Sequence, residues 1–164
     1  MTTRVLVTSD THLTIGAELP DALLRLADRA DHVVHAGDLV RLDVFDTLST
    51  LAPVTAVAGN VDDAAVASQL PDRATVTIGD VPFAVVHDAG GAGGRHARLR
   101  SWFPDARVLV YGHSHMPELT TLEDGTIIVN PGSPTQRRRA PTHTACWIEV
   151  VGGAVSAADL VHLD

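Results

Sequence analysis

Short apolar runs alternate with longer amphipathic stretches through the first third of the chain. Val5–Thr8, His32–His35 and Val54–Val57 are short and rich in β-branched residues, which is typical of buried strands. Between them, Leu19–Ala30 and Val44–Ala52 repeat leucine, valine and alanine at helical spacing. A strand, helix, strand, helix, strand sequence is typical of right-handed parallel crossovers, so we expect an α/β fold that begins with a parallel sheet.

The remaining two thirds of the chain contain more strands than helices. The dipeptide Gly79-Asp80 separates two strand-like runs and predicts a hairpin, as does Gly152-Gly153 near the C-terminus. Short helices are expected at Ala64–Leu70 and His96–Phe103. The expected strands are Thr75–Ile78, Val81–Val86, Val108–Tyr111, Leu119–Leu122, Thr126–Asn130, Thr144–Val151 and Ala154–Leu163. We therefore expect two sheets packed face to face, with helices outside.

A glycine-rich segment, Ala89–Gly94, precedes the second short helix. Its composition suggests a mobile loop. The spacing of its glycines differs from the GxGxxG pattern of dinucleotide-binding proteins, and no long βαβ unit follows it. The segment therefore gives no support to dinucleotide binding.

Length and composition narrow the classes of function. The 164 residues fit one domain, residues 1–164, and 45% hydrophobic with 20% charged residues is typical of a globular chain. The formal net charge of −8 argues against a broad nucleic-acid or membrane surface, but it leaves a small phosphate ester open as substrate. No stretch has the pattern of a signal peptide or a transmembrane helix, so we expect a cytoplasmic protein without membrane contact. Homo-oligomer formation stays open.

Side chains that bind metals stand at the ends of five apolar runs. Because the carboxyl ends of parallel strands lie along one edge of a sheet, segments far apart in sequence would meet there. They supply two carboxylates, one amide and four imidazoles, which is enough to hold two metal ions. The segments are Asp10-Thr11-His12, Gly37-Asp38, Gly59-Asn60, His87 and Gly112-His113-Ser114-His115.

The spacing within these segments suits metal binding. Asp10 and His12 are two positions apart, as are His113 and His115, and on an extended chain such residues point to the same face. Asp38 follows a glycine, which leaves room for close approach, and its two carboxylate oxygens can bridge two cations.

Two divalent cations about 3.5–4 Å apart can clamp a phosphoryl group and acidify a shared water, and they stabilise charge in the transition state. We therefore predict a dinuclear metal hydrolase of phosphate esters, with Asp38, Asn60 and His113 as catalytic residues. Ser9 or Ser114 could act as a nucleophile with a histidine base, but no aspartate is placed to complete a triad.

The ordered set of five segments resembles the calcineurin-like metallophosphoesterases, in which Asp-x-His, Gly-Asp, Gly-Asn, His and Gly-His-x-His follow in this order. The later Asn130-Pro131-Gly132-Ser133 is similar to the small single-domain YfcE-type phosphodiesterase branch. The resemblance covers nearly the whole chain. It implies a four-layer αββα sandwich, an α/β fold of two mixed sheets with flanking helices.

The resemblance also implies how the ligands are shared, with Asp38 bridging the two ions. One site would comprise Asp10, His12, Asp38 and His115, and the other Asp38, Asn60, His87 and His113. Mn²⁺ is a common activator in the family, and Fe, Zn, Co or Ni also suit these ligands. The implied activity is hydrolysis of small phosphate diesters by a metal-bridging hydroxide. Phosphomonoester hydrolysis is the alternative.

Two positions depart from the family pattern. Val61 stands where many larger relatives have a histidine that stabilises the transition state or protonates the leaving group. Its absence favours diesters or activated esters. Asp88 stands where glycine is usual, and it could orient a ligating histidine, replace the missing acid or be a plain loop residue.

Several other polar residues have two interpretations. His35 precedes Asp38 on its strand, and we expect packing or support of a ligand. Asp62 and Asp63 suit a helix N-terminus better than metal support. The run Arg137–Arg139 could hold a phosphate or face solvent, and these alternatives stay open.

A protein-binding scaffold is the rival to an enzyme. The retromer subunit that shares the implied fold serves as a protein-binding module and has a degraded metal site. In this chain no ligand position is lost, which favours the enzyme.

Overall fold

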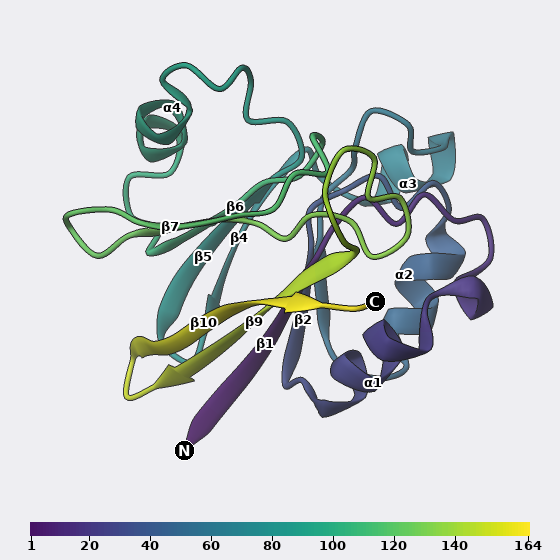
Figure 1. Cartoon of the computed structure of the whole chain (residues 1–164), viewed down its shortest axis with the longest axis horizontal. Helices are drawn as coiled ribbons and strands as arrows, with labels where there is room; N and C mark the ends of the chain where they lie inside the picture. The colour runs from purple at the N-terminus through teal and green to yellow at the C-terminus, as the bar shows by residue number, and fades with distance from the viewer.

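The computed structural model describes residues 1–164 as two five-stranded sheets between helices (Figure 1). In the first sheet, three parallel strands follow the crossover pattern, and a C-terminal hairpin is added antiparallel beside the first of them. The strand order is β10-β9-β1-β2-β3, with β1 at Thr2–Thr8, β2 at His32–His35, β3 at Val54–Ala56, β9 at Thr144–Val151 and β10 at Ala154–His162.

The second sheet is also mixed. Its central strands β5, β6 and β8 are parallel, and each edge strand is antiparallel to its neighbour. The order is β4-β5-β6-β8-β7, with β4 at Arg73–Ile78, β5 at Val81–Val86, β6 at Val108–Val110, β7 at Glu118–Thr121 and β8 at Ile127–Asn130. The predicted β4–β5 hairpin is confirmed: Ile78 pairs with Val81, and Gly79 and Asp80 both have positive φ, as a tight two-residue turn requires.

Helices cover the outer faces of both sheets, on opposite sides of the molecule (Figure 1). Leucines and valines of α1 and α2 pack on the first sheet, and Leu99 of α4 packs on the second. The helices are α1 at Asp21–Arg29, α2 at Leu42–Ser49, α3 at Ala64–Gln69 and α4 at Arg95–Trp102, with a short 3₁₀ helix at Gly16–Glu18. The α/β four-layer αββα sandwich that the sequence implies is confirmed.

A core of small β-branched residues fills the space between the sheets. Val7, Val34 and Ile148 from the first sheet pack with Phe83 and Val110 from the second, and all five are buried. Because aromatic residues are scarce, alternate valines and isoleucines of the strands supply most of this contact. The tight core fixes the two sheets against each other, and with them the loops at their carboxyl ends. No helix in the molecule is both long and apolar enough to span a membrane.

Candidate metal centre

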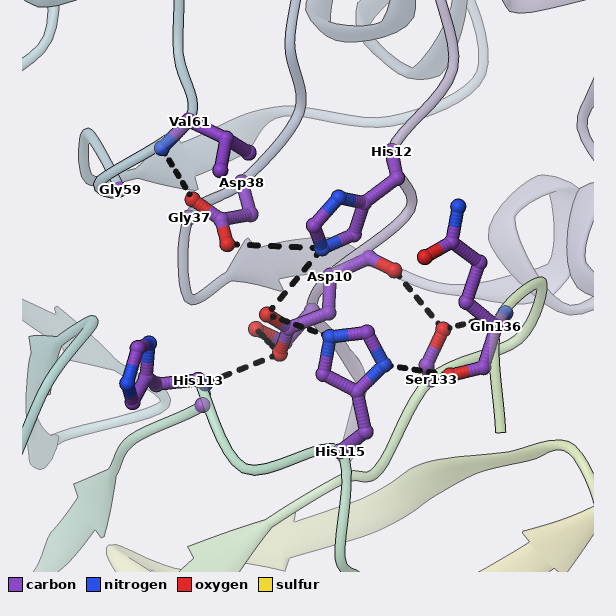
Figure 2. Close-up of polar contacts among 12 residues, drawn as sticks. Asp10, His12, Gly37, Asp38, Gly59, Val61, His113, His115, Ser133 and Gln136 are labelled. Atoms are coloured by element: carbon purple, nitrogen blue, oxygen red, sulfur yellow. Dashed lines mark hydrogen bonds and ion pairs between the residues drawn. The ribbon is translucent and has the colours of Figure 1, made fainter. Parts of the chain in front are cut away.

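The five segments predicted from the sequence meet at one place. Those after β1, β2 and β3 come from the first sheet, and those after β5 and β6 come from the second. Figure 2 shows Asp10, His12, Asp38, His113 and His115 converging from these loops. The centre therefore lies where the carboxyl ends of both sheets face each other.

Asp10, His12 and His115 form one group whose ligand-type atoms lie within 4.8 Å of one another. Asp10 Oδ1 is 3.7 Å from His12 Nε2 and 3.4 Å from His115 Nε2. The other oxygen, Oδ2, accepts hydrogen bonds from Ser9 Oγ at 2.7 Å and from the backbone N–H of His113 at 3.1 Å. One carboxylate oxygen of Asp10 is thus held by the protein while the other faces the two imidazoles.

Asp38, His87 and His113 form a second group of the same size. Asn60 joins it, because its Oδ1 lies 3.0 Å from His87 Nε2 and 3.1 Å from His113 Nδ1. Asp38 Oδ2 lies 3.2 Å from His87 Nε2, and also 3.4 Å from His12 Nε2 of the first group. The same oxygen of Asp38 therefore stands between the two groups.

Divalent cations fit these donors. Asp10 Oδ1, His12 Nε2 and His115 Nε2 are buried and have no hydrogen-bond partner. Burying polar atoms without a partner costs free energy, and a bound cation would supply the missing partner. The Nδ1 atoms of His87 and His115 face the backbone carbonyls of Ala36 and Gln136, to which they donate. These bonds leave each Nε2 lone pair pointing at the centre, as metal ligation requires.

The backbone of the ligand loops is strained. Asp10, His12, Asp38, His113 and His115 all have positive φ, between 48° and 73°. The prediction that the Asp-x-His and His-x-His pairs lie on extended chain is therefore wrong, since β1 ends at Thr8 and β6 at Val110. Left-handed turns, not strand alternation, bring these side chains together. Clusters of such residues mark functional sites, because surrounding structure must hold them in place.

The comparisons with known proteins agree with this geometry. The family model described as the calcineurin-like phosphoesterase superfamily domain matches residues 3–153. The chain belongs to this superfamily. A probable metallophosphoesterase of Methanocaldococcus jannaschii is 36% identical over 136 residues, which cover 80% of this chain and 68% of the relative.

Solved structures show the same fold. A predicted phosphoesterase from Streptococcus pneumoniae superposes with a TM-score of 0.77 at 24% identity, covering 100% of this chain and 91% of that one. Vps29 of Entamoeba histolytica, complexed with zinc, superposes with a TM-score of 0.74 at 23% identity, covering 99% of this chain and 100% of that one.

The predicted glycines allow the close contacts of this phosphoesterase centre. A Cβ on Gly59 would lie 2.1 Å from Asp38 Oδ1, and a Cβ on Gly37 would lie 2.8 Å from His87 Nδ1. Gly37 also has a φ of 95°, which favours glycine. At both positions the missing side chain leaves room for a residue of another loop, Asp38 at Gly59 and His87 at Gly37.

Charge and burial act in opposite directions on the ligands. Burial lowers the pKa of His87, but the hydrogen bond to Asp38 and the negative charges of Asp10 and Asp38 outweigh it, so the pKa is raised. For Asp38, burial alone would raise the pKa. The hydrogen bonds from His87 and from the backbone N–H of Val61 lower it by more than burial raises it, so the net shift of the pKa is downward. The carboxylate of Asp38 is thus held in its anionic form.

His35 supports the ligand loops, as the sequence predicts. It is fully buried; its Nδ1 accepts a hydrogen bond from the N–H of Gly37 at 3.1 Å, so its Nε2–H donates to Thr11 Oγ1, also at 3.1 Å. Burial lowers the pKa of His35 to about 4, which keeps the ring neutral. The ring joins the loop after β1 to the loop after β2.

Asp62 and Asp63 have different roles. Asp63 caps α3, accepting from the N–H of Val66 at 2.9 Å, which confirms the N-terminal role. Asp62 instead accepts from the N–H groups of Gly59 at 2.6 Å and Asp38 at 3.2 Å, as well as from Val40. It therefore joins the loop after β2 to the loop after β3, and this supporting role is the alternative that the sequence analysis named but did not favour.

The Asn-Pro-Gly-Ser segment contacts the loops of the centre, and Figure 2 shows its Ser133 beside Asp10. Ser133 Oγ donates to the carbonyl of Asp10 at 2.8 Å, and Asn130 Nδ2 donates to the carbonyl of Gly112 at 3.2 Å. The sequence carried a signal for this segment in its resemblance to small phosphodiesterases, but no role could be assigned to it from one chain.

The remaining predicted residues lie at the edge of the centre or outside it. Asp88 is exposed and accepts from the N–H of Gly90 at 2.8 Å, a loop contact and not support of a ligating imidazole. Ser9 is fully buried and donates to Asp10, and Ser114 Oγ accepts from Asn130, so neither hydroxyl is paired with a histidine base. Arg137–Arg139 is exposed, and Arg137 donates to the carbonyl of Ala140.

Proposed function

We propose that this chain is a dinuclear metal-dependent phosphodiesterase acting on small phosphate diesters. One observation carries the proposal. Asp38 Oδ2 lies 3.4 Å from His12 Nε2 and 3.2 Å from His87 Nε2, so one carboxylate oxygen faces two separate groups of ligand atoms. This arrangement suits two cations that share a bridging carboxylate.

Each group of residues would hold one ion, with Mn²⁺ as the proposed metal. Asp10, His12 and His115 hold the first, Asn60, His87 and His113 hold the second, and Asp38 serves both. When bound, the two ions supply Lewis-acid activation of water and neutralise charge on the phosphoryl group. The protein's own part is to fix these side chains, through strained loops and buried hydrogen bonds, before substrate arrives.

The surroundings of Asn60 favour a diester. Val61 is 43% exposed beside the centre and has no proton to give to a leaving oxygen. Its backbone N–H donates to Asp38 Oδ1 at 3.0 Å, which fixes the bridging carboxylate instead. A leaving group that departs without protonation therefore suits the site better than an alkoxide, which needs a proton from an acid.

The test is hydrolysis of bis-p-nitrophenyl phosphate and p-nitrophenyl phosphate after EDTA treatment and return of Mn²⁺. We expect metal-dependent turnover that favours the diester. Removing a residue that only hydrogen-bonds to a metal ligand typically reduces activity by roughly 10–100-fold. Asp38→Asn should reduce activity by more than this, because it removes the charge that bridges the two ions. Asp28→Asn, an exposed carboxylate on α1, is the matched control and should keep wild-type activity.

The outcomes separate the alternatives. Preference for the monoester would make the protein a phosphatase with the same centre. Wild-type turnover by folded, metal-supplied Asp38→Asn protein would overturn the dinuclear proposal.

The structural likeness to Vps29 supports a second candidate, a non-catalytic protein-binding scaffold. The scaffold predicts no turnover of any diester with any divalent metal, together with a stoichiometric protein complex. Retention of every ligand position favours the enzyme. Metal binding alone does not separate the two candidates, because Vps29 of Entamoeba histolytica is complexed with zinc, so turnover is the deciding measurement.

A further inference from the structure

A hollow of about 300 Å³ opens directly beside the candidate metal centre. Asn60 and His87, which belong to the second ligand group, line one side of it. A phosphate ester held at the centre would therefore direct one of its substituents into this hollow. Its volume lies at the small end of ligand pockets, which span about 300–1,000 Å³, so it suits a small group.

The rest of the lining is charged and brought together by strand pairing. Arg73 pairs with Val86 across the β4–β5 hairpin, which places Asp72 and Asp88 on neighbouring chain ends at the rim. Asp72 makes no hydrogen bond or ion pair with any side chain, and Asp88 uses only Oδ1, in its bond to Gly90. Carboxylate oxygens are thus free to accept hydrogen bonds from a ligand.

Arg73 also lines this hollow and carries a cation beside the two carboxylates. Its guanidinium lies 4.1 Å from the centre of the Trp102 ring and 5.8 Å from that of Phe103, and it forms no ion pair with a carboxylate. Stacking on Trp102 holds the guanidinium plane while leaving its N–H groups unpaired. The hollow therefore places a guanidinium close to two carboxylates that have free oxygens.

We propose that this hollow binds a hydroxyl-bearing, glycerol-like or sugar-like arm of the substrate, selected by Asp72, Arg73 and Asp88. The proposal rests on the proposed phosphoesterase function and names its substrate class. A hydroxyl group donates to a carboxylate and accepts from a guanidinium, so it satisfies both kinds of side chain. Two other kinds of arm fit less well. A second phosphate would be repelled by two carboxylates, and an aryl group would cover charged side chains without giving them hydrogen-bond partners.

The experiment compares two diesters that share a p-nitrophenyl leaving group, one with a 2,3-dihydroxypropyl arm and one with a propyl arm. Only formation of the open-chain alkyl phosphate is counted, because attack by the substrate's own neighbouring hydroxyl would release p-nitrophenolate and leave a cyclic phosphate. We expect wild-type, Mn²⁺-loaded protein to favour the dihydroxypropyl ester by about tenfold in kcat/KM, the worth of one charge-assisted hydrogen bond. Asp88→Asn keeps an oxygen for the Gly90 N–H and removes the charge. It and Asp72→Asn should each reduce the preference several-fold, while Asp28→Asn should not change it.

A binding measurement separates this proposal from the proposed function. Calorimetry of the Mn²⁺-loaded protein with glycerol 3-phosphate and with propyl phosphate needs no turnover, and tighter binding of glycerol 3-phosphate supports the hollow even if no diester is hydrolysed. Equal affinity for the two, a preference that survives both Asp→Asn changes, or no measurable binding of either overturns the proposal. A preference for an amine-bearing arm over the dihydroxypropyl arm overturns the hydroxyl class.

Discussion

His35 is a buried imidazole whose protonation opposes folding. Burial lowers its pKa from 6.5 to about 4, so between these values the unfolded chain binds a proton that the folded protein does not. Stability that is complete above pH 6.5 is therefore lost as the pH falls, by about 3 kcal/mol at pH 4. Urea denaturation of the EDTA-treated protein at a series of pH values measures this loss.

The matched variant is His35→Asn, whose amide oxygen can accept from the N–H of Gly37 as Nδ1 does. This variant should be less stable at pH 7 but should lose less stability between pH 6.5 and pH 4 than the wild type. Identical pH dependence in the two proteins would show that His35 is not the group that titrates.

At the residue scale, the sequence predicted which side chains gather but not how. Asp10 and His12 could be grouped because both follow a buried strand, and the structure brings them within 3.7 Å. Their left-handed backbone could not be predicted, since aspartate and histidine adopt it only where tertiary contacts impose it. The supporting role of Asp62 was not favoured for the same reason: two of its three backbone donors, Asp38 and Val40, come from a loop that only the fold brings close.

At the element scale, close contact between two loops requires glycine at position 59. The loop after β3 passes so near the loop after β2 that a Cβ on Gly59 would meet Asp38 Oδ1 at 2.1 Å and Asp38 N at 2.4 Å. Gly59→Ala should therefore destabilise the protein by about 1–3 kcal/mol, as overpacking does, and reduce metal affinity. Thermal unfolding and Mn²⁺ titration measure both effects.

Gly91→Ala is the control for this prediction. Nothing lies within 4 Å of a Cβ at Gly91, which also lacks a positive φ. The change should leave stability and metal affinity near the wild-type values. Equal effects at Gly59 and Gly91 would show that the loop contact is not what requires glycine.

The glycine-rich loop between β5 and α4 is tied to the helix that follows it. The guanidinium of Arg98 donates to the carbonyls of Ala89 at 2.7 Å, Gly91 at 3.1 Å and Gly93 at 3.0 Å. Arg98→Ala should make hydrogen exchange of residues 89–94 faster by about tenfold, because each lost bond lowers the local opening free energy. Mass spectrometry of deuterated peptides measures the rate.

Arg25→Ala, on the exposed side of α1, should leave exchange of the loop unchanged. Unchanged exchange in Arg98→Ala would instead agree with the mobile loop that the composition suggests.

The apolar pattern predicted nearly all elements, because each strand or helix buries its own face. The boundaries differ where pairing decides them: β1 begins at Thr2, before the apolar run, since Thr2–Arg4 pair with β9. The helix predicted from Leu19 begins at Asp21, after a 3₁₀ turn at Gly16–Glu18 that has no apolar periodicity. The order of the strands in each sheet could not be predicted from the sequence, since the residues whose contacts set it lie far apart in the chain.

For the whole molecule, the candidate centre joins the two sheets. The first sheet presents Asp10, His12, Asp38 and Asn60, and the second presents His87, His113 and His115. Each ion bound there should stabilise the folded protein by about 2.7 kcal/mol at 100 times its dissociation constant, which raises Tm by about 5–10 °C per ion. Calorimetry with Mn²⁺ and with EDTA measures the difference.

Asp38→Asn is the appropriate comparison, because it leaves the core between the sheets unaltered. Its Tm in EDTA should stay within a few degrees of wild type, and its gain from Mn²⁺ should be much smaller. A gain equal to that of the wild type would place the stabilising ions elsewhere.

The position of β1 between β2 and β9 has a consequence for how the chain matures on the ribosome. β1 is synthesised well before its antiparallel neighbour β9, which begins only at Thr144. Until that segment emerges, one edge of β1 keeps its backbone groups unpaired, and such edges can pair with other chains. The segment that carries Asp10 and His12 therefore gains its full sheet only after β9 has been synthesised, and nascent chains that stall before Thr144 should aggregate more readily than chains that extend past β9.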